Sequence, residues 1–183
     1  MTEVSGYRVQ GLLKNRHLQS ILSSSPWRRR AGLARLRRLG VLGQAHMLSL
    51  PDGVRLAGTH YPSPNPDPRR ALVLLMHGWE GSAESSYINH STAELLNAGV
   101  DVFALNFRDH GQSHELNEGI FHSCRLQEVI DAAREVLSRF QPSRFFVAGY
   151  SLGGNFSLRL ALAAGPESLP IQAAFAICPP INP

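Results

Sequence analysis

Cysteine is scarce in this sequence, and long apolar runs are missing from it. Of the 183 residues only Cys124 and Cys178 are cysteines, and their spacing suggests neither a zinc site nor a redox pair. A disulfide framework is thereby excluded, and we expect both thiols to be reduced and structural. The longest uninterrupted apolar stretches, such as residues 71–76, are far shorter than the roughly 20 residues that span a bilayer. The N-terminal residues lack the apolar core of a signal peptide, so we expect a cytoplasmic protein.

The composition is that of a single folded domain. With 43% hydrophobic residues, a chain of 183 residues can bury a substantial core. No cluster of histidine, cysteine and acidic residues has the spacing of a metal site, so we expect no metal.

The formal net charge of +4 is unevenly distributed along the chain. Six arginines fall within residues 27–38, where they alternate with Leu33 and Leu36 at helical spacing. The simplest interpretation is a solvated helix that packs its leucines on the domain. A weak contact of Arg28–Arg38 with an anionic membrane surface is a second interpretation. We expect no nucleic-acid partner, because the rest of the chain offers neither aromatic platforms nor a basic stripe. The sequence indicates no oligomeric state.

The pattern of apolar and polar residues predicts two segments. Residues 1–45 form a helical, basic extension that packs on the domain, and residues 46–183 form its core. A hairpin opens the core, because residues 45–50 and 54–61 alternate apolar and polar side chains around a proline- and glycine-containing turn. A polar loop with four prolines follows the hairpin.

From residue 71 onward, predicted strands and helices alternate. The strands are nearly continuous runs of Val, Leu, Ala and Phe, which suits a sheet buried on both faces. We therefore predict an α/β fold with a mostly parallel sheet and helices on both of its faces. Ligands bind at the carboxyl ends of such strands, so the candidate site loops follow Met76, Phe107, Tyr150 and Cys178. The predicted strands are residues 71–78, 100–107, 144–150 and 171–178, and the predicted helices surround residues 87–99, 125–140 and 155–165.

Ser151 is the candidate nucleophile. It lies in the sequence GYSLGG, residues 149–154, at the joint of a predicted strand and a predicted helix. A strand-to-helix elbow forces its serine into a strained backbone conformation and projects the hydroxyl out of the turn. The residues two positions before and after must be small, and Gly149 and Gly153 satisfy this, with further room from Gly154. An ordinary glycine-rich turn is the alternative for this motif alone.

A second motif, His77-Gly78-Trp79, ends the first buried strand. A tetrahedral intermediate carries an oxyanion that needs two donors, and Gly78 allows the backbone amide of Trp79 to turn inward. The amide of Leu152, at the first turn of the helix after Ser151, points to the same place and gains from the helix dipole. Trp79 and Leu152 are therefore the candidate oxyanion hole. We expect His77 to hold this loop by hydrogen bonding rather than to act as the catalytic base.

With both motifs in place, the chain resembles the α/β-hydrolases, and more narrowly their YheT-like branch of hydrolases and esterases. The resemblance runs from about residue 10 to the end of the chain and rests on the order and spacing of several segments. It implies an α/β-hydrolase fold and a serine hydrolase of carboxylic esters, with acyl lipids as one candidate class and without a cofactor. The segments are NRHLQSIL, LPDGVRL, HGWEGSAESSY, NFRDHGQS, FHS and GYSLGGN.

The α/β-hydrolases place their catalytic acid, and then their histidine, after the serine. One acid, Glu167, and no histidine follow Ser151 in these 183 residues. Glu167 lies just past the predicted elbow helix, far from the family's position for the acid, so we assign it no catalytic role. We expect a truncated chain that lacks the last strands, exposes an apolar sheet edge and is inactive alone. A base upstream of the serine, His110 or His122, is the alternative.

Two further functions fit the same motifs. An acyltransferase uses the same nucleophile and oxyanion hole with an acceptor other than water. A catalytically inactive binding module would retain the pocket, and the absence of an acid and a histidine supports it. The intact serine and glycines favour chemistry, but they do not separate the hydrolase from the transferase.

Overall fold

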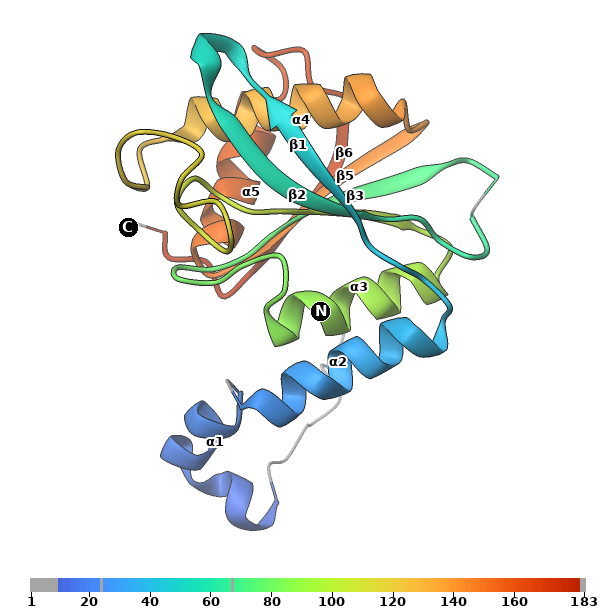
Figure 1. Cartoon of the computed structure of the whole chain (residues 1–183), viewed down its shortest axis with the longest axis vertical. Coiled ribbons are helices and arrows are strands. Elements are labelled where there is room, and N and C mark those ends of the chain that lie inside the picture. Colours follow the sequence, from blue (N-terminus) through green and yellow to red (C-terminus); the bar gives the residue numbers. More distant parts are fainter. Residues whose placement is uncertain (1–9, 24, 67, 182–183) are drawn as a thin grey trace, which may run out of the picture.

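The computed structural model describes residues 10–23, 25–66 and 68–181. Within these residues, six strands form one sheet in the order β1-β2-β4-β3-β5-β6 (Figure 1). β2 pairs antiparallel with β1 and β4, and the remaining neighbours are parallel, which confirms a mostly parallel sheet with an N-terminal hairpin. The strands are β1 (Gln44–Ser49), β2 (Arg55–Tyr61), β3 (Ala71–Met76), β4 (Asp101–Leu105), β5 (Arg144–Tyr150) and β6 (Ile171–Ile177).

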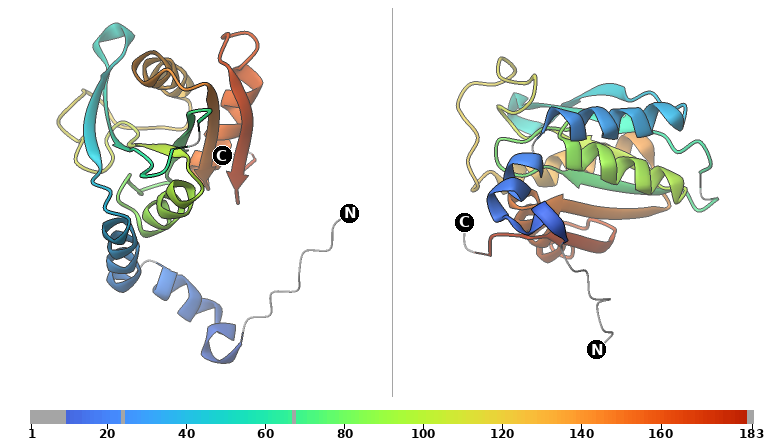
Figure 2. Two further views of the ribbon diagram at one scale, coloured as in Figure 1. Left: turned by 90° about the vertical axis from the view of Figure 1, so that its right-hand side faces the viewer. Right: turned by 90° about the horizontal axis from the view of Figure 1, so that it is seen from below.

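Helices cover both faces of the sheet, as predicted. α3 packs on one face, with α2 lying outside it, and α4 and α5 pack on the other face (Figures 1 and 2). The predicted helix after the serine begins three residues earlier than expected, because the strand-to-helix turn contains one residue, Ser151. The helices are η1 (Gly11–Lys14), α1 (Arg16–Ser23), α2 (Pro26–Arg38), η2 (Pro51–Gly53), α3 (Ser86–Asn97), α4 (Leu126–Phe140) and α5 (Leu152–Ala163).

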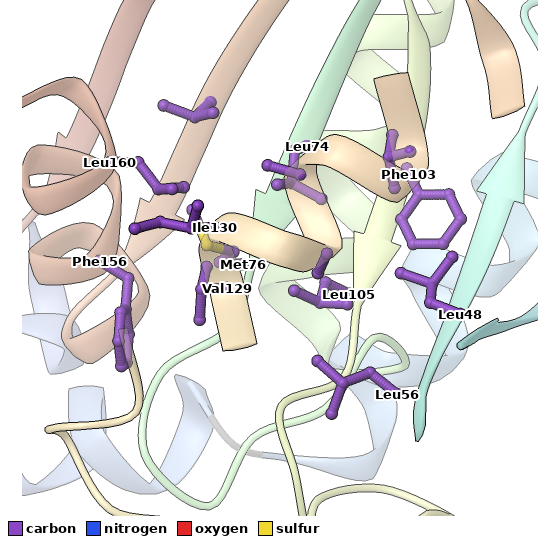
Figure 3. Packing of buried hydrophobic residues seen from close by; sticks show 14 of the residues in the cluster. Leu48, Leu56, Leu74, Met76, Phe103, Leu105, Val129, Ile130, Phe156 and Leu160 are labelled. Carbon is purple, nitrogen blue, oxygen red and sulfur yellow. The ribbon is translucent and has the colours of Figure 1, made fainter. Parts of the chain in front are cut away.

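The central strand β3 is buried along its whole length. Successive side chains of a strand point to opposite faces, so Leu72, Leu74 and Met76 join the cluster under α4 and α5, and Val73 and Leu75 join the cluster under α3. Figure 3 shows the first of these clusters at close range, with labelled residues from β3, β4, α4 and α5. This burial on both faces explains why the sequence of β3 is uniformly apolar and not alternating.

The basic segment forms α2, which packs along α3 through Gly32 and Leu36. Leu36 is buried and Leu33 is half-buried, so the two leucines do face the domain as expected. Residues 1–9 of the predicted extension lie outside the described residues. The division into residues 1–45 and 46–183 stays a prediction, and β1 begins at Gln44.

In the described part of the chain, β6 is the edge strand next to β5. Phe175 and Ile177 on this strand are exposed, which agrees with the expected apolar edge.

Candidate active site

Ser151 is the single residue between β5 and α5. Its backbone has φ 50 and ψ −117. A residue with a side chain in such a sparsely populated region carries roughly 1–3 kcal/mol of strain, which the surrounding structure must hold in place. The Ser151 amide donates to the carbonyl of Ile177 at 2.8 Å and so ties the turn to β6. Ser151 is exposed and its hydroxyl does not cap α5, which leaves Oγ available at the carboxyl edge of the sheet.

The glycines around Ser151 occupy places where a side chain has no room. A Cβ on Gly149 would lie 2.2 Å from the carbonyl oxygen of Gly153. A Cβ on Gly153 would lie 2.4 Å from the carbonyl oxygen of His77, on the neighbouring strand's loop. Gly154 is less constrained, because its nearest atom would be 3.1 Å away. Gly149 and Gly153 therefore allow β5, α5 and the loop after β3 to meet at one point.

Gly78 brings the second motif to the first. A Cβ built on Gly78 would lie 3.2 Å from Cβ of Ser151 and 3.3 Å from the carbonyl oxygen of Tyr150. The loop after β3 and the elbow after β5 are thus in direct contact at the end of two adjacent parallel strands.

The peptide group between Gly78 and Trp79 is fixed by two donors. The carbonyl oxygen of Gly78 accepts from Nδ1 of His77 at 2.7 Å and from the amide of Gly81 at 3.0 Å. In a trans peptide the N–H points opposite to the C=O, so the amide of Trp79 points away from His77 and Gly81. Glu80, in the left-handed region at φ 53, completes this turn.

His77 is neutral in this arrangement. Its Nε2 accepts the amide of Phe107 at 3.3 Å, so the ring proton sits on Nδ1, where it is donated to Gly78. The pKa of His77 is lowered to about 4, mainly by burial and also by nearby His110, against the opposing effect of the Gly78 hydrogen bond. A buried histidine with both nitrogens engaged orients the loop and has no free nitrogen for proton transfer.

Leu152 begins α5, and its side chain is buried. Its amide is the first of the helix and belongs to the unpaired donors that every helix N-terminus presents. The helix dipole adds partial positive charge at the same position. The amides of Trp79 and Leu152 therefore come from two loops that meet at Ser151.

Two contacts near the candidate site were not predicted from the sequence. The hydroxyl of Tyr87 accepts the amide of Gly78 at 3.0 Å, and its ring packs against that of Tyr150, with 4.8 Å between centroids. Nδ1 of His114 lies 2.7 Å from a carboxylate oxygen of Asp109. The sequence feature that could have indicated the Tyr87 contact is an aromatic residue in the first turn of the helix that follows the loop. Asp109 and His114 are a polar pair within one loop, which no pattern marks as functional.

Two hollows flank the loop formed by residues 79–82. One, of about 580 Å³, is lined by this loop and by Asp109, His114 and Phe121. The other, of about 470 Å³, lies between the same loop, Tyr87 and the start of α2. The hollows leave room for a ligand on both sides of the loop that carries the Trp79 amide. Trp79 itself is 60% exposed, and its ring contacts Phe121 edge-on.

The two histidines that precede Ser151 and were candidate bases make contacts with other residues. His110 is buried, and its Nδ1 donates to the carbonyl of Arg108 at 2.8 Å while its ring lies 5.0 Å from that of His77. His122 is exposed and lines a separate hollow with Arg125. Among the described residues, no hydrogen bond joins Oγ of Ser151 to a histidine.

Comparison with known proteins agrees with this architecture. "Putative esterase YheT" of Escherichia coli is 33% identical over 137 residues, which are 73% of this chain and 39% of that protein. "Embryogenesis-associated protein EMB8" of Picea glauca is 25% identical over 112 residues, 61% of this chain and 24% of that protein. The chain thus spans less than half the length of these relatives. The solved structure of the Pyrococcus furiosus esterase Pf2001 superposes with a TM-score of 0.65 at 21% identity, over 80% of this chain and 52% of that one, and shows the shared fold.

Residues 71–183 match the family described as alpha/beta hydrolase fold. This region contains both loops of the candidate site and every strand of the parallel part of the sheet. The chain belongs to the α/β-hydrolase family.

Proposed function

We propose that the chain carries the nucleophile and oxyanion hole of a serine hydrolase that acts on carboxylic esters, with acyl lipids as one substrate class. The observation that carries this proposal is the strained backbone of Ser151, held at φ 50 and in contact with Gly78 of the oxyanion loop. Strain of this kind persists only where the surrounding structure enforces it, and it is typical of functional sites. The names of the relatives YheT and Pf2001, both given as esterases, support the same reaction class.

In the proposed reaction, Oγ of Ser151 attacks the ester carbonyl carbon, and the carbonyl oxygen becomes an oxyanion. The amides of Trp79 and Leu152 stabilise this negative charge. A histidine takes the serine proton and gives it to the leaving alcohol, which departs as the acyl-serine forms. Water, deprotonated by the same histidine, then attacks the acyl-serine and releases the carboxylic acid and the free serine.

We place the acid and the histidine of this reaction on sequence outside the 183 residues. Two observations support this placement. No histidine follows Ser151 in these residues. Upstream, Nδ1 of His110 is bonded to the carbonyl of Arg108, and His122 lines a separate hollow with Arg125. The family order of serine, acid and histidine points the same way. In this proposal the 183-residue chain alone does not turn over esters. A cytoplasmic location stays a prediction from the sequence.

The test is ester hydrolysis by the full product of the gene that contains this sequence. With p-nitrophenyl acetate and butyrate, Ser151→Ala is expected to lower kcat by about 10³-fold or more, since removal of a triad member has effects of this size. Ser143→Ala, which changes an exposed serine in the loop before β5, is the matched control and keeps full activity. Hydrolysis that survives Ser151→Ala would refute the proposal.

The same assay separates the alternatives. If an added alcohol changes the main product from the carboxylic acid to a new ester, the protein is an acyltransferase. A folded protein that binds esters without turnover would be the inactive binding module. Rapid Ser151-dependent turnover by the 183-residue chain alone would place the base within these residues.

A further inference from the structure

The positive charge of the molecule is concentrated on its N-terminal arm, which we define as residues 10–38. This arm contains eight Lys or Arg residues and no acidic residue. Residues 52–183, in contrast, carry nine Lys or Arg residues against thirteen acidic ones. The arm is therefore a cationic segment attached to a body of net negative charge.

Only part of this charge is neutralised by the body. Within α2, Arg29 pairs with Glu84 and Arg35 pairs with Glu94. Four further arginines of α2 are exposed and make no ion pair within the described part of the chain: Arg28, Arg30, Arg37 and Arg38. These side chains are available to a partner that carries negative charge.

Large apolar side chains are exposed on the same arm. Trp27 is 80% exposed and Leu12 is 83% exposed, and Leu22 is also exposed. Trp27 lies nine residues before Leu36, about two and a half helical turns, so it is on the opposite side of α2 from this buried residue. Arg38 lies about three turns after Trp27 and shares its face. The outer face of α2 therefore combines tryptophan and arginine.

The orientation of this face is fixed by the packing of α2 on α3. A Cβ on Gly32 would lie 2.9 Å from Cβ of Asn89, which shows how closely the two helices approach. Figures 1 and 2 show α2 lying along α3 on the side away from the sheet, with α1 beyond it. The outer face of α2 thus points away from the body.

The arm also borders the candidate active site. The hollow of about 470 Å³ is lined on one side by Ser25, Arg28 and Arg29 of the arm, and on the other by residues 79–82 and Tyr87. A surface that binds the arm therefore comes close to the loop that carries the Trp79 amide.

We propose that the arm binds an anionic lipid surface, with Trp27 at the interface and the unpaired arginines of α2 on the lipid headgroups. Tryptophan prefers the headgroup region of bilayers, and arginine can lay its apolar stem along the interface while its charge meets phosphate. Anionic lipid surfaces attract clustered basic residues in this way. The binding itself stands without the proposed function. The further consequence, that acyl lipids reach Ser151 from this surface, rests on it.

The test is co-sedimentation of the Ser151→Ala protein with vesicles, so that binding is measured without turnover. Vesicles of phosphatidylcholine with about one third phosphatidylglycerol are expected to bind at least tenfold more protein at low salt than pure phosphatidylcholine vesicles, since the attraction is electrostatic. Arg30→Ala/Arg38→Ala is expected to lower this binding about tenfold or more. Trp27→Ala is expected to weaken the binding that remains at high salt. Circular dichroism and thermal unfolding of each variant establish that it is folded.

The matched control is Arg134→Ala/Arg139→Ala, which removes the same charge from α4, on the other face of the sheet. It is expected to bind vesicles like the parent. Equal loss in both double variants would show a general charge effect and overturn the proposal, as would equal binding to neutral and anionic vesicles or no binding at low salt. Preferential binding of a DNA duplex over the vesicles, lost in Arg30→Ala/Arg38→Ala, would assign the arm to nucleic acid instead. Ester hydrolysis is measured separately, so a failure of the proposed function would leave these outcomes unchanged.

Discussion

The hydroxyl of Tyr87 accepts a 3.0 Å hydrogen bond from the amide of Gly78, and the ring of Tyr87 packs on that of Tyr150, the residue before Ser151. One side chain thus contacts both the loop after β3 and the last residue of β5. The hydroxyl of Tyr150 is in turn bonded to Ser91 of α3. The loop that carries the Trp79 amide is therefore bonded to α3 through Tyr87.

Tyr87→Phe is expected to release the amide of Gly78 while it preserves the ring packing. The loss of one hydrogen bond predicts a decrease of about 1 kcal/mol in the free energy of unfolding. Hydrogen exchange at the Gly78 amide, followed by NMR, is expected to accelerate at least tenfold. Ser91→Ala is the control, because it removes the bond to Tyr150 and leaves Gly78 untouched. Unchanged exchange in Tyr87→Phe would contradict the role of this hydroxyl.

Gly149→Ala is expected to destabilise the fold strongly. The new Cβ would lie 2.2 Å from backbone atoms of Gly153, so β5 and α5 would have to separate. Overpacking of this kind typically lowers the free energy of unfolding by about 1–3 kcal/mol. We expect a value at the upper end, because the new Cβ meets backbone atoms, which cannot easily move away. The matched change is Gly165→Ala, whose Cβ would meet no atom within 4 Å. Urea unfolding of both variants measures the difference, and equal midpoints would contradict the close approach of Gly149 to Gly153.

Arg108→Met is expected to loosen the loop after β4. Arg108 is buried and donates to both carboxylate oxygens of Glu128 and to the carbonyl of Glu118. Its removal leaves Glu128 in a largely buried place with Arg125 as its cation, and a broken buried pair typically costs roughly 3–5 kcal/mol. Chemical unfolding checks this figure. The exposed ion pair of Arg134 is the comparison, and Arg134→Met should change stability very little.

Buried histidines predict a stability that depends on pH. Burial lowers the pKa of His77 from 6.5 to about 4, and it also lowers the pKa of His46 and His60. A folded-state pKa below the unfolded one means that the unfolded chain binds more protons between these two values. The stability from His77 is therefore fully present above about pH 6.5 and is lost as the pH falls toward about pH 4.

Urea midpoints across this range provide the measurement. His77→Gln is expected to depend less on pH than the parent, because its share of the proton uptake is gone. A parent midpoint that stays constant from about pH 7 to about pH 5 would contradict the prediction.

Most of the fold could be predicted from the sequence, because periodicity carries it. The uniformly apolar β3 and the alternating residues of β1 and β2 have patterns that their burial requires, and their predicted bounds fall within a few residues of those observed. The strand order could not be predicted in this way. It depends on which strands pair across long sequence separations, and no local pattern predicts that β4 lies between β2 and β3.

The candidate site could be predicted only where local backbone demands mark it. Gly149 and Gly153 are visible because a turn with a serine at its tip needs small residues at this spacing. Tyr87 is not visible in the same way, since its contact with Gly78 depends on how α3 leaves the loop. Asp109 and His114 contact each other through a loop conformation that includes a left-handed Asp109, at φ 58.

The most direct test of the nucleophile is the reaction of the folded 183-residue chain with a fluorophosphonate over a range of pH, read by peptide mass spectrometry. In our proposal the catalytic histidine lies outside these residues, so hydroxide acts as the base at high pH. An oxyanion hole alone retains part of the rate enhancement, about 10³–10⁴-fold over water in triad enzymes. We predict labelling at Ser151 that is slow at neutral pH, rises with pH and exceeds labelling of exposed Ser143 at least a hundredfold. Equal labelling of Ser151 and Ser143 by the folded chain would contradict the account.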